Sequence, residues 1–304
     1  MAGTSDNPII YPPLEMPPNV VRTQITVWCL GLALDADIYR PTDAAPGPLP
    51  GVVLSHGIGG DKLTSERYAA KFASSGMVAV AFSQTSWGNS DGRMMLVDRD
   101  ADRHADGSMT ARVQMAKELI DPLDWIDCYR AVLDYLEGEP GVDPDRLGAW
   151  GTSFGGGTAM SIAATDSRIK ALAVQVPAVF ELPDEITQPG RVRARQIARG
   201  EFNALGLGGD TLPGVPGTPH LARMVQYLVG QQAQHLRVPT LILDAGDEEL
   251  FNTDDSGRRA HEILNANDVE NYYEVIPGID HYGIYFDGYD RGSQLANDWL
   301  IRHL

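Results

Sequence analysis

The 304-residue sequence has little cysteine, an excess of acidic over basic residues and no long apolar run. Its two cysteines, Cys29 and Cys128, cannot build a disulfide framework and lie in no CxxC or Cys/His cluster, which favours a reducing compartment. The net charge is -17, so nucleic acid and anionic membranes would be repelled. No run reaches the roughly 18–20 apolar residues of a membrane helix, and the N-terminus lacks a signal-peptide pattern. We therefore expect a cytoplasmic protein with neither nucleic acid nor a membrane as partner.

The order of apolar and helical segments predicts the fold class. Short apolar runs, typical of strands buried on both faces of a sheet, cover residues 51–57, 77–83, 145–151, 169–177, 239–245 and 271–277. Helical spacing covers residues 65–76, 122–138, 155–165, 255–266 and 292–304, with Ser65 as a cap of the first helix. Strand–helix alternation predicts right-handed crossovers and a mostly parallel, doubly wound α/β sheet. Residues 23–41 alternate like an antiparallel hairpin that turns near Gly31.

Two segments do not follow this alternation. Residues 1–20 carry five prolines and are expected to form an extended arm. Residues 178–236 are rich in proline, glycine and arginine and are too long for a plain connection, so we expect an inserted lid. Residues 21–304 would then form a single domain that carries this lid.

A candidate nucleophile lies in the stretch Gly151-Thr152-Ser153-Phe154-Gly155, which matches the pattern G-x-S-x-G. The motif directly follows a predicted strand and directly precedes a predicted helix, which is the setting of a nucleophile elbow. Such a serine sits on a strained turn, and a neighbour with a Cβ would collide with the adjoining strand and helix. The alternative is a glycine-rich turn with an incidental serine. No Lys-Ser or Lys-Thr pair follows, which excludes a phosphate-binding Walker loop.

An oxyanion site would need two backbone N–H donors. One is expected from Phe154, the residue after the nucleophile. The other is expected from Ile58, in the loop after an early strand, where neighbouring glycines such as Gly57 allow close approach to a substrate. His56 would shape this loop by hydrogen bonds and border the substrate, rather than act as the base.

The general base is expected in the loop after the last strand, C-terminal to the serine and the acid. Of seven histidines, His281 fits this place. The acid is then expected in the loop after the strand at 239–245, where Asp247, Glu248 and Glu249 follow one another.

Four segments resemble the α/β-hydrolase superfamily, and the resemblance extends over nearly all of residues 22–304. They are LSHGIGGDK (54–62), GVDPDRLGAWGTSFGGGTAMSIAATDSRIKALAVQVP (141–177), VPTLILDAGDEELF (238–251) and VIPGIDHYGIYF (275–286). The chain looks most like dienelactone-hydrolase-like esterases and polyketide-transferase-like hydrolases. The resemblance implies a Ser–acid–His triad without a metal or an organic cofactor. Dienelactone hydrolases proper use cysteine as nucleophile, whereas this chain has Ser153 at that position. The resemblance therefore does not imply that this chain shares their substrate.

The resemblance also indicates which carboxylate is the acid. In this group the acid is usually an Asp, followed by one residue and then an apolar pair. That position falls on Glu248, before the pair Leu250–Phe251, and Glu is accepted in such triads. Asp247 is the runner-up, because a shift of one residue would restore the usual residue type, and Glu249 comes third.

Two segments outside the motifs bear on substrate binding. Trp87, with Met94 and Met95, follows a strand and is expected to line an apolar acyl site or to pack under the lid. The arginines of the predicted lid are Arg191, Arg193, Arg195 and Arg199. They would either bind a substrate carboxylate or form a solvated face paired with nearby acids.

The sequence thus predicts a serine esterase that acts on a small-molecule ester or lactone. Acyl transfer and hydrolysis of a C–C bond in a diketone use the same triad and stay open, as does a homo-oligomer. A peptidase would need a large extra domain to select peptides, and the sequence indicates none. The non-enzymatic alternative is a ligand-binding relative, which typically loses the serine or the histidine.

Overall fold

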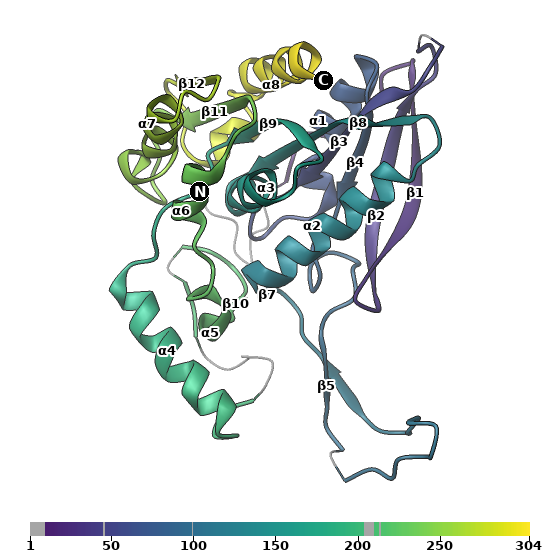
Figure 1. Ribbon diagram of the computed structural model, residues 1–304, viewed down its shortest axis with the longest axis vertical. Coiled ribbons are helices and arrows are strands. Elements are labelled where there is room, and N and C mark those ends of the chain that lie inside the picture. Colours follow the sequence, from purple (N-terminus) through teal and green to yellow (C-terminus); the bar gives the residue numbers. More distant parts are fainter. Residues whose placement is uncertain (1–9, 45, 99, 204–209, 213) are drawn as a thin grey trace.

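The structure is a computed structural model that describes residues 10–44, 46–98, 100–203, 210–212 and 214–304. An eight-stranded sheet forms its centre, with the strands in the order β1-β2-β4-β3-β8-β9-β11-β12 (Figure 1). These strands are β1 (Val20–Cys29), β2 (Leu32–Pro41), β3 (Leu49–Ser55), β4 (Val78–Phe82), β8 (Val142–Thr152), β9 (Ile169–Gln175), β11 (Thr240–Ala245) and β12 (Asn271–Ile276). From β4 to β12 all neighbours are parallel, while β2 is antiparallel to both β1 and β4. The predicted mostly parallel sheet and its antiparallel hairpin are confirmed.

The β1–β2 hairpin turns where the sequence predicts. Leu30 and Gly31 form the two-residue turn, with φ angles of 50° and 83°. Two consecutive left-handed residues match the right-handed twist of the flanking strands, and glycine adopts this conformation without steric cost.

Successive residues of the buried strands supply two separate cores. In β3, Val53 packs into one core, while Val52 and Leu54 pack into the other. Helices α2 (Pro122–Glu137), α3 (Phe154–Thr165) and α7 (Gly257–Ala266) cover the Val53 face. Helices α1 (Glu66–Ser74) and α8 (Tyr289–His303) cover the opposite face. Both faces of the sheet are therefore buried, which explains why these strands are continuous apolar runs in the sequence.

The start of α1 differs in detail from the prediction. Ser65 occupies the N-cap position, but its side chain makes no capping hydrogen bond and its hydroxyl donates to the carbonyl of Lys62. A 3-10 turn, Lys62–Thr64, precedes the helix, and the Asp61 carboxylate caps this turn by accepting from the backbone N–H of Leu63. The cap therefore acts one turn earlier than predicted.

Residues 178–236, the predicted lid, hold several short elements beside the sheet. They are α4 (Asp184–Ala198), β10 (Thr218–Pro219), α5 (Leu221–Met224) and α6 (Val229–Gln232). β10 pairs with β7 (Leu119–Ile120). Arg223 of α5 lies 2.5 Å from Asp121 and 2.9 Å from Asp124, both at the start of α2. Because both carboxylates are buried, this ion cluster attaches the segment firmly to the body.

A second excursion from the sheet was not indicated by the sequence. β5 (Met94–Leu96) and β6 (Val113–Met115) form a two-stranded antiparallel hairpin, which projects away from the body (Figure 1). Each strand has three residues, too few for a clear alternation of apolar and polar side chains. Arg93, just before β5, holds its base to α2 through two contacts with Asp124 of 2.5 and 2.6 Å.

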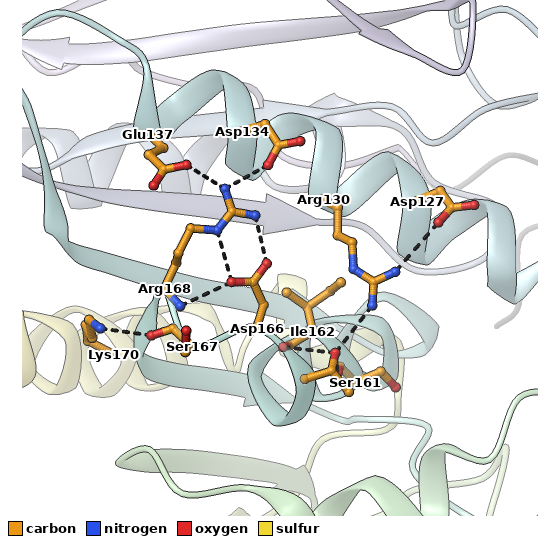
Figure 2. Close-up of polar contacts among 11 residues, drawn as sticks. Asp127, Arg130, Asp134, Glu137, Ser161, Ile162, Asp166, Ser167, Arg168 and Lys170 are labelled. Atoms are coloured by element: carbon orange, nitrogen blue, oxygen red, sulfur yellow. Dashed lines mark hydrogen bonds and ion pairs between the residues drawn. The ribbon is translucent and has the colours of Figure 1, made fainter.

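Arg168 joins the loop between α3 and β9 to helix α2 (Figure 2). Its guanidinium contacts Asp166, Asp134 and Glu137, each at 2.7 Å. These carboxylates, Asp166 foremost, raise the pKa of Arg168. The group is partly open to solvent, so the cluster orients α2 against α3 more than it adds to the free energy of unfolding.

Among the described residues, no helix is long and apolar enough to cross a bilayer. Cys29 and Cys128 are free and buried.

A buried ion cluster joins the loop after β3 to the hairpin. Lys62 Nζ lies 2.7 Å from Asp35 Oδ1 and 2.9 Å from Asp37 Oδ1, and only 12% of the lysine side chain is exposed. Both aspartates lie on β2. The lysine therefore offsets the repulsion between these two buried carboxylates and fixes the loop that precedes α1.

We predict that Lys62→Met lowers the free energy of unfolding by about 3–5 kcal/mol, because it leaves two unpaired buried charges. Urea denaturation measures the loss. The triple variant Lys62→Met/Asp35→Asn/Asp37→Asn is the control and should recover most of it. A loss below about 1 kcal/mol, as for a surface ion pair, would contradict the prediction.

Candidate active site

Ser153 lies at the sharp turn between β8 and α3. Its backbone has φ 55° and ψ −126°, a conformation that costs free energy for a residue with a side chain. A Cβ on Gly155 would lie 2.1 Å from the carbonyl oxygen of His56, and one on Gly151 would lie 2.3 Å from that of Gly155. Both glycines of the motif are therefore required by packing, as the sequence predicts for an elbow.

Ser153, His281 and Glu248 lie in one chain of hydrogen bonds. Ser153 Oγ is 3.0 Å from His281 Nε2, and His281 Nδ1 is 2.9 and 2.8 Å from the two Glu248 oxygens. Glu248 follows β11 and His281 follows β12, so the parallel strands deliver all three to one edge of the sheet. The His281 and Glu248 side chains are only 2% and 3% exposed. The carboxylate therefore acts on the imidazole without screening by water.

The three consecutive carboxylates after β11 have different places. Glu248 contacts the His281 ring. Glu249, third in the expected order for the acid, accepts a hydrogen bond of 2.8 Å from the backbone N–H of His281. Asp247 is exposed, and its backbone N–H donates to the carbonyl of Ile279. Two adjacent glutamates thus hold one histidine, by ring and by backbone.

The loop after β3 lies directly against the serine. A Cβ on Gly57 would lie 2.8 Å from the Cβ of Ser153. Ile58 follows in this loop, and Phe154 is the first residue of α3. In the described part of the chain, the N–H groups of Ile58 and Phe154 have no acceptor. Their expected role as oxyanion donors stays a prediction.

His56 shapes this loop, and the structure corrects its expected place beside a substrate. The ring is fully buried. Its Nδ1 lies 2.7 Å from the Gly57 carbonyl, and its Nε2 accepts from the backbone N–H of Gln84 at 3.0 Å. Burial lowers its pKa to about 4. With both nitrogens engaged in the neutral state, His56 has no free position for proton transfer.

A cavity of about 620 Å³ opens beside Ser153 and His281, and Gly57 and Ile58 form part of its wall. Its other walls are largely apolar and aromatic. They include Phe154, Phe180, Ile186, Met224, Tyr227 and Phe251. Several of these come from residues 178–236, so the segment predicted to be a lid supplies much of the cavity.

The structure also decides between the two expected positions of Trp87. Trp87 is not part of this cavity wall, because its Nε1 donates to the carbonyl of Leu119 and its ring packs edge-on against Trp125. Met94 and Met95 lie on the projecting hairpin and line a different cavity. Of the two alternatives that the sequence leaves for Trp87, packing under the predicted lid fits, because a Cβ on Gly217 would lie 2.9 Å from its ring.

The arginine cluster of the predicted lid lies on or beside α4, away from the cavity. Arg199 pairs with Glu201 at 2.6 Å. Arg193 pairs with Asp210 at 2.9 Å and covers the ring of Phe202. None of the four arginines lines the cavity, which favours the solvated face over recognition of a substrate carboxylate.

Several residues of the cavity were not indicated by the sequence. Tyr11 comes from the N-terminal arm, and Arg259 comes from α7. Glu181 lies 3.6 Å from Arg259, and Asp255 lines the same part of the wall. No motif or periodicity marks these positions, because their placement depends on how distant segments pack. Among the described residues, no group of three or more His, Cys, Asp or Glu side chains is arranged to hold a metal ion.

The family model of X-Pro dipeptidyl-peptidase (S15 family) matches residues 31–234, more than half of the chain. The matched span holds Ser153 and both expected oxyanion donors, and it ends before Glu248 and His281.

Individual proteins are also similar to this chain in sequence or in structure. The quorum-quenching protein AidA of Acinetobacter baumannii is 28% identical, over 47% of this chain and 39% of its own. The polyketide transferase claH of Penicillium crustosum is 26% identical, over 52% of this chain and 44% of its own. This chain therefore spans less than half of the length of these curated relatives. A putative dienelactone hydrolase of Klebsiella pneumoniae superposes with a TM-score of 0.59 at 16% identity, over 93% of this chain and 98% of its own, which shows the α/β-hydrolase fold.

A buried carboxyl group lies at the end of β11, behind this site. Asp244 is inaccessible to solvent, and the Tyr273 hydroxyl donates to its Oδ2 at 2.9 Å. Burial raises the pKa of Asp244 to about 7; the Tyr273 hydrogen bond opposes this shift, and the negative charge of Glu248 adds to it. Between about pH 4 and 7 the folded protein therefore holds a proton here that the unfolded chain releases.

We predict that Asp244 lowers the free energy of unfolding by up to about 1.4 kcal/mol per pH unit as pH rises from about 4 to 7, while His56, whose pKa burial lowers to about 4, acts in the opposite direction below about pH 6.5. Asp244→Asn removes the first contribution, so its free energy of unfolding should rise more steeply with pH than that of the wild type, which urea denaturation across the pH range measures. Asp247→Asn, an exposed carboxylate from the same loop, is the matched control and should keep the wild-type slope. Equal slopes in wild type and Asp244→Asn would refute the prediction.

Proposed function

Because the chain belongs to the X-Pro dipeptidyl-peptidase (S15) family, within the α/β-hydrolase branch that includes dienelactone hydrolases and polyketide transferases, we propose that it is a serine hydrolase. Its reaction would cleave a carboxylic ester or lactone through an acyl-enzyme on Ser153. The observation that carries the proposal is the hydrogen-bond chain from Ser153 Oγ through His281 to Glu248.

In the proposed reaction each group has one step. His281 donates its Nδ1–H to Glu248, so Nε2 is free to take the proton of Ser153 as Oγ attacks the carbonyl carbon. The N–H groups of Ile58 and Phe154 would hold the oxyanion, at the N-terminus of α3 where negative charge is favoured. The protonated His281 then gives its proton to the leaving alcohol. Water, activated by the same imidazole, releases the acid and frees Ser153.

The cavity supports a small substrate with an apolar acyl group. Aromatic and aliphatic side chains form most of its wall, and burial of apolar surface would supply most of the binding free energy. Residues 178–236 are proposed to act as the lid that keeps water from this wall. Transfer of the acyl group to an alcohol or amine, or cleavage of a C–C bond in a diketone, needs the same three residues and stays an alternative.

Peptide cleavage is the second candidate, since the family model is named for a dipeptidyl-peptidase. The carboxylates Glu181 and Asp255 on the cavity wall favour it, because they would suit the N-terminal ammonium of a peptide. Glu181 is already paired with Arg259, so it is less available to an ammonium group. Esters therefore remain the preferred candidate substrates over peptides.

We predict that a fluorophosphonate probe labels Ser153 and that purified protein hydrolyses activated esters or lactones. A panel of p-nitrophenyl esters, lactones and Xaa-Pro p-nitroanilides measures the preference, with Ser153→Ala as the blank. Turnover restricted to the Xaa-Pro substrates would establish the peptidase candidate instead. Failure to label Ser153 in folded protein would favour a ligand-binding relative without catalysis.

We further predict that the three carboxylates separate by kinetics. Glu248→Gln should lower kcat by about 10³–10⁴-fold, because the imidazole loses the charge that orients it and stabilises its protonated form. Glu249→Gln keeps an acceptor for the His281 backbone and should cost less than about tenfold, while Asp247→Asn should have no effect. Near-normal turnover by Glu248→Gln would show that the acid is assigned wrongly.

A further inference from the structure

Tyr11 reaches the catalytic cavity from a segment that precedes the sheet. The described arm, residues 10–19, has no helix or strand, yet Tyr11 lines the cavity together with Ser153 and His281. Its ring packs edge-on against Tyr285, with centroids 5.3 Å apart, and stacks on Phe286 at 6.5 Å. Tyr285 in turn is hydrogen-bonded to Thr152, the residue before Ser153. The arm is therefore attached to the turn that carries the nucleophile.

Tyr11 also borders a second cavity of about 800 Å³. The two cavities share three wall residues, namely Tyr11, Gly60 and Thr64. Thr64 belongs to the 3-10 turn that follows the loop after β3, and it stands with Tyr11 on the wall that both cavities share. Tyr11 and Thr64 thus form a partition between the two spaces.

The two sides of this partition differ in chemistry. The catalytic side is mostly apolar and aromatic. The far side is lined by polar and charged groups, including Asp61, Asn89, Asp91, Lys117 and Glu118. An acyl chain that extended past the partition would move its end from an apolar wall to a hydrated polar one.

We propose that Tyr11 is a specificity-determining residue that closes the acyl-binding cavity, so that the substrates are esters whose apolar acyl chain ends before the polar cavity. This inference rests on the proposed serine-hydrolase function. Removing the ring would join the two cavities. Longer chains would then fit, and chains with a polar end would gain most, because their end groups would be hydrated on the far side.

The test compares p-nitrophenyl acetate, octanoate, hexadecanoate and 16-hydroxyhexadecanoate. For Tyr11→Ala we expect kcat/KM for the two long esters, relative to octanoate, to rise at least tenfold, with the hydroxylated ester ahead. Tyr11→Phe keeps the ring and should keep the wild-type ratio. Leu14→Ala is the matched control, because Leu14 packs on the same core from the same arm and does not line the cavity.

The outcomes separate specificity from damage to the fold. An equal loss for all esters in Tyr11→Ala, or the same shift in Leu14→Ala, would overturn the proposal. Tyr11→Leu serves as a second variant if Tyr11→Ala unfolds at lower temperature, since it shortens the side chain and keeps it apolar.

Binding keeps the inference testable if the proposed function fails. Calorimetric titration of octanoate and hexadecanoate into the Ser153→Ala protein, with and without Tyr11→Ala, needs no turnover. Tighter binding of hexadecanoate only when the ring is absent supports the partition, even if no ester is hydrolysed. Equal affinities in both backgrounds would refute it.

Discussion

The close approach of two loops is the constraint on which the site depends. The loop after β3 and the turn after β8 touch so tightly that a Cβ on Gly155 would lie 2.1 Å from the His56 carbonyl oxygen. This contact restricts the position of Ser153, whose backbone has a positive φ of 55°. It also brings the loop that carries Ile58 up to the serine, since a Cβ on Gly57 would lie 2.8 Å from the Cβ of Ser153. The buried pair of His56 with the Gln84 backbone and the Lys62 ion cluster hold the first loop in place.

His281 is held just as closely from the other side of the site. Glu248 fixes its ring and Glu249 its backbone, so neither rotation of the side chain nor drift of the loop is free. Behind them, Asp244 is a buried acid whose raised pKa keeps it protonated below about pH 7, so it adds no second negative charge beside Glu248 there. The site therefore combines backbone strain at the serine with a neutral buried acid behind Glu248.

Sequence reasoning succeeded where local pattern and sheet geometry coincide. Apolar runs gave the strands of the parallel sheet, and their chain order placed the segments of Ser153, Glu248 and His281 at one edge, because parallel strands end on the same side. It left two positions open for Trp87, because long-range contacts decide how that loop turns, and it did not indicate Tyr11, which comes from an arm without periodicity. The hydrogen bond between Glu249 and the His281 backbone could not be predicted either. Which way each of three adjacent carboxylates points depends on the backbone conformation of the loop.

The projecting β5–β6 hairpin gives the molecule an uneven stability. In the described part of the chain its two strands pair only with each other, and Met94, Val113 and Met115 are exposed. An isolated two-stranded ribbon is marginally stable in water. Its amide hydrogens should therefore exchange with solvent through local opening, while those of β3, β8 and β9 exchange only when the whole protein unfolds. The hairpin and the catalytic edge thus belong to different cooperative units of one chain, joined at its base by Arg93 and Asp124.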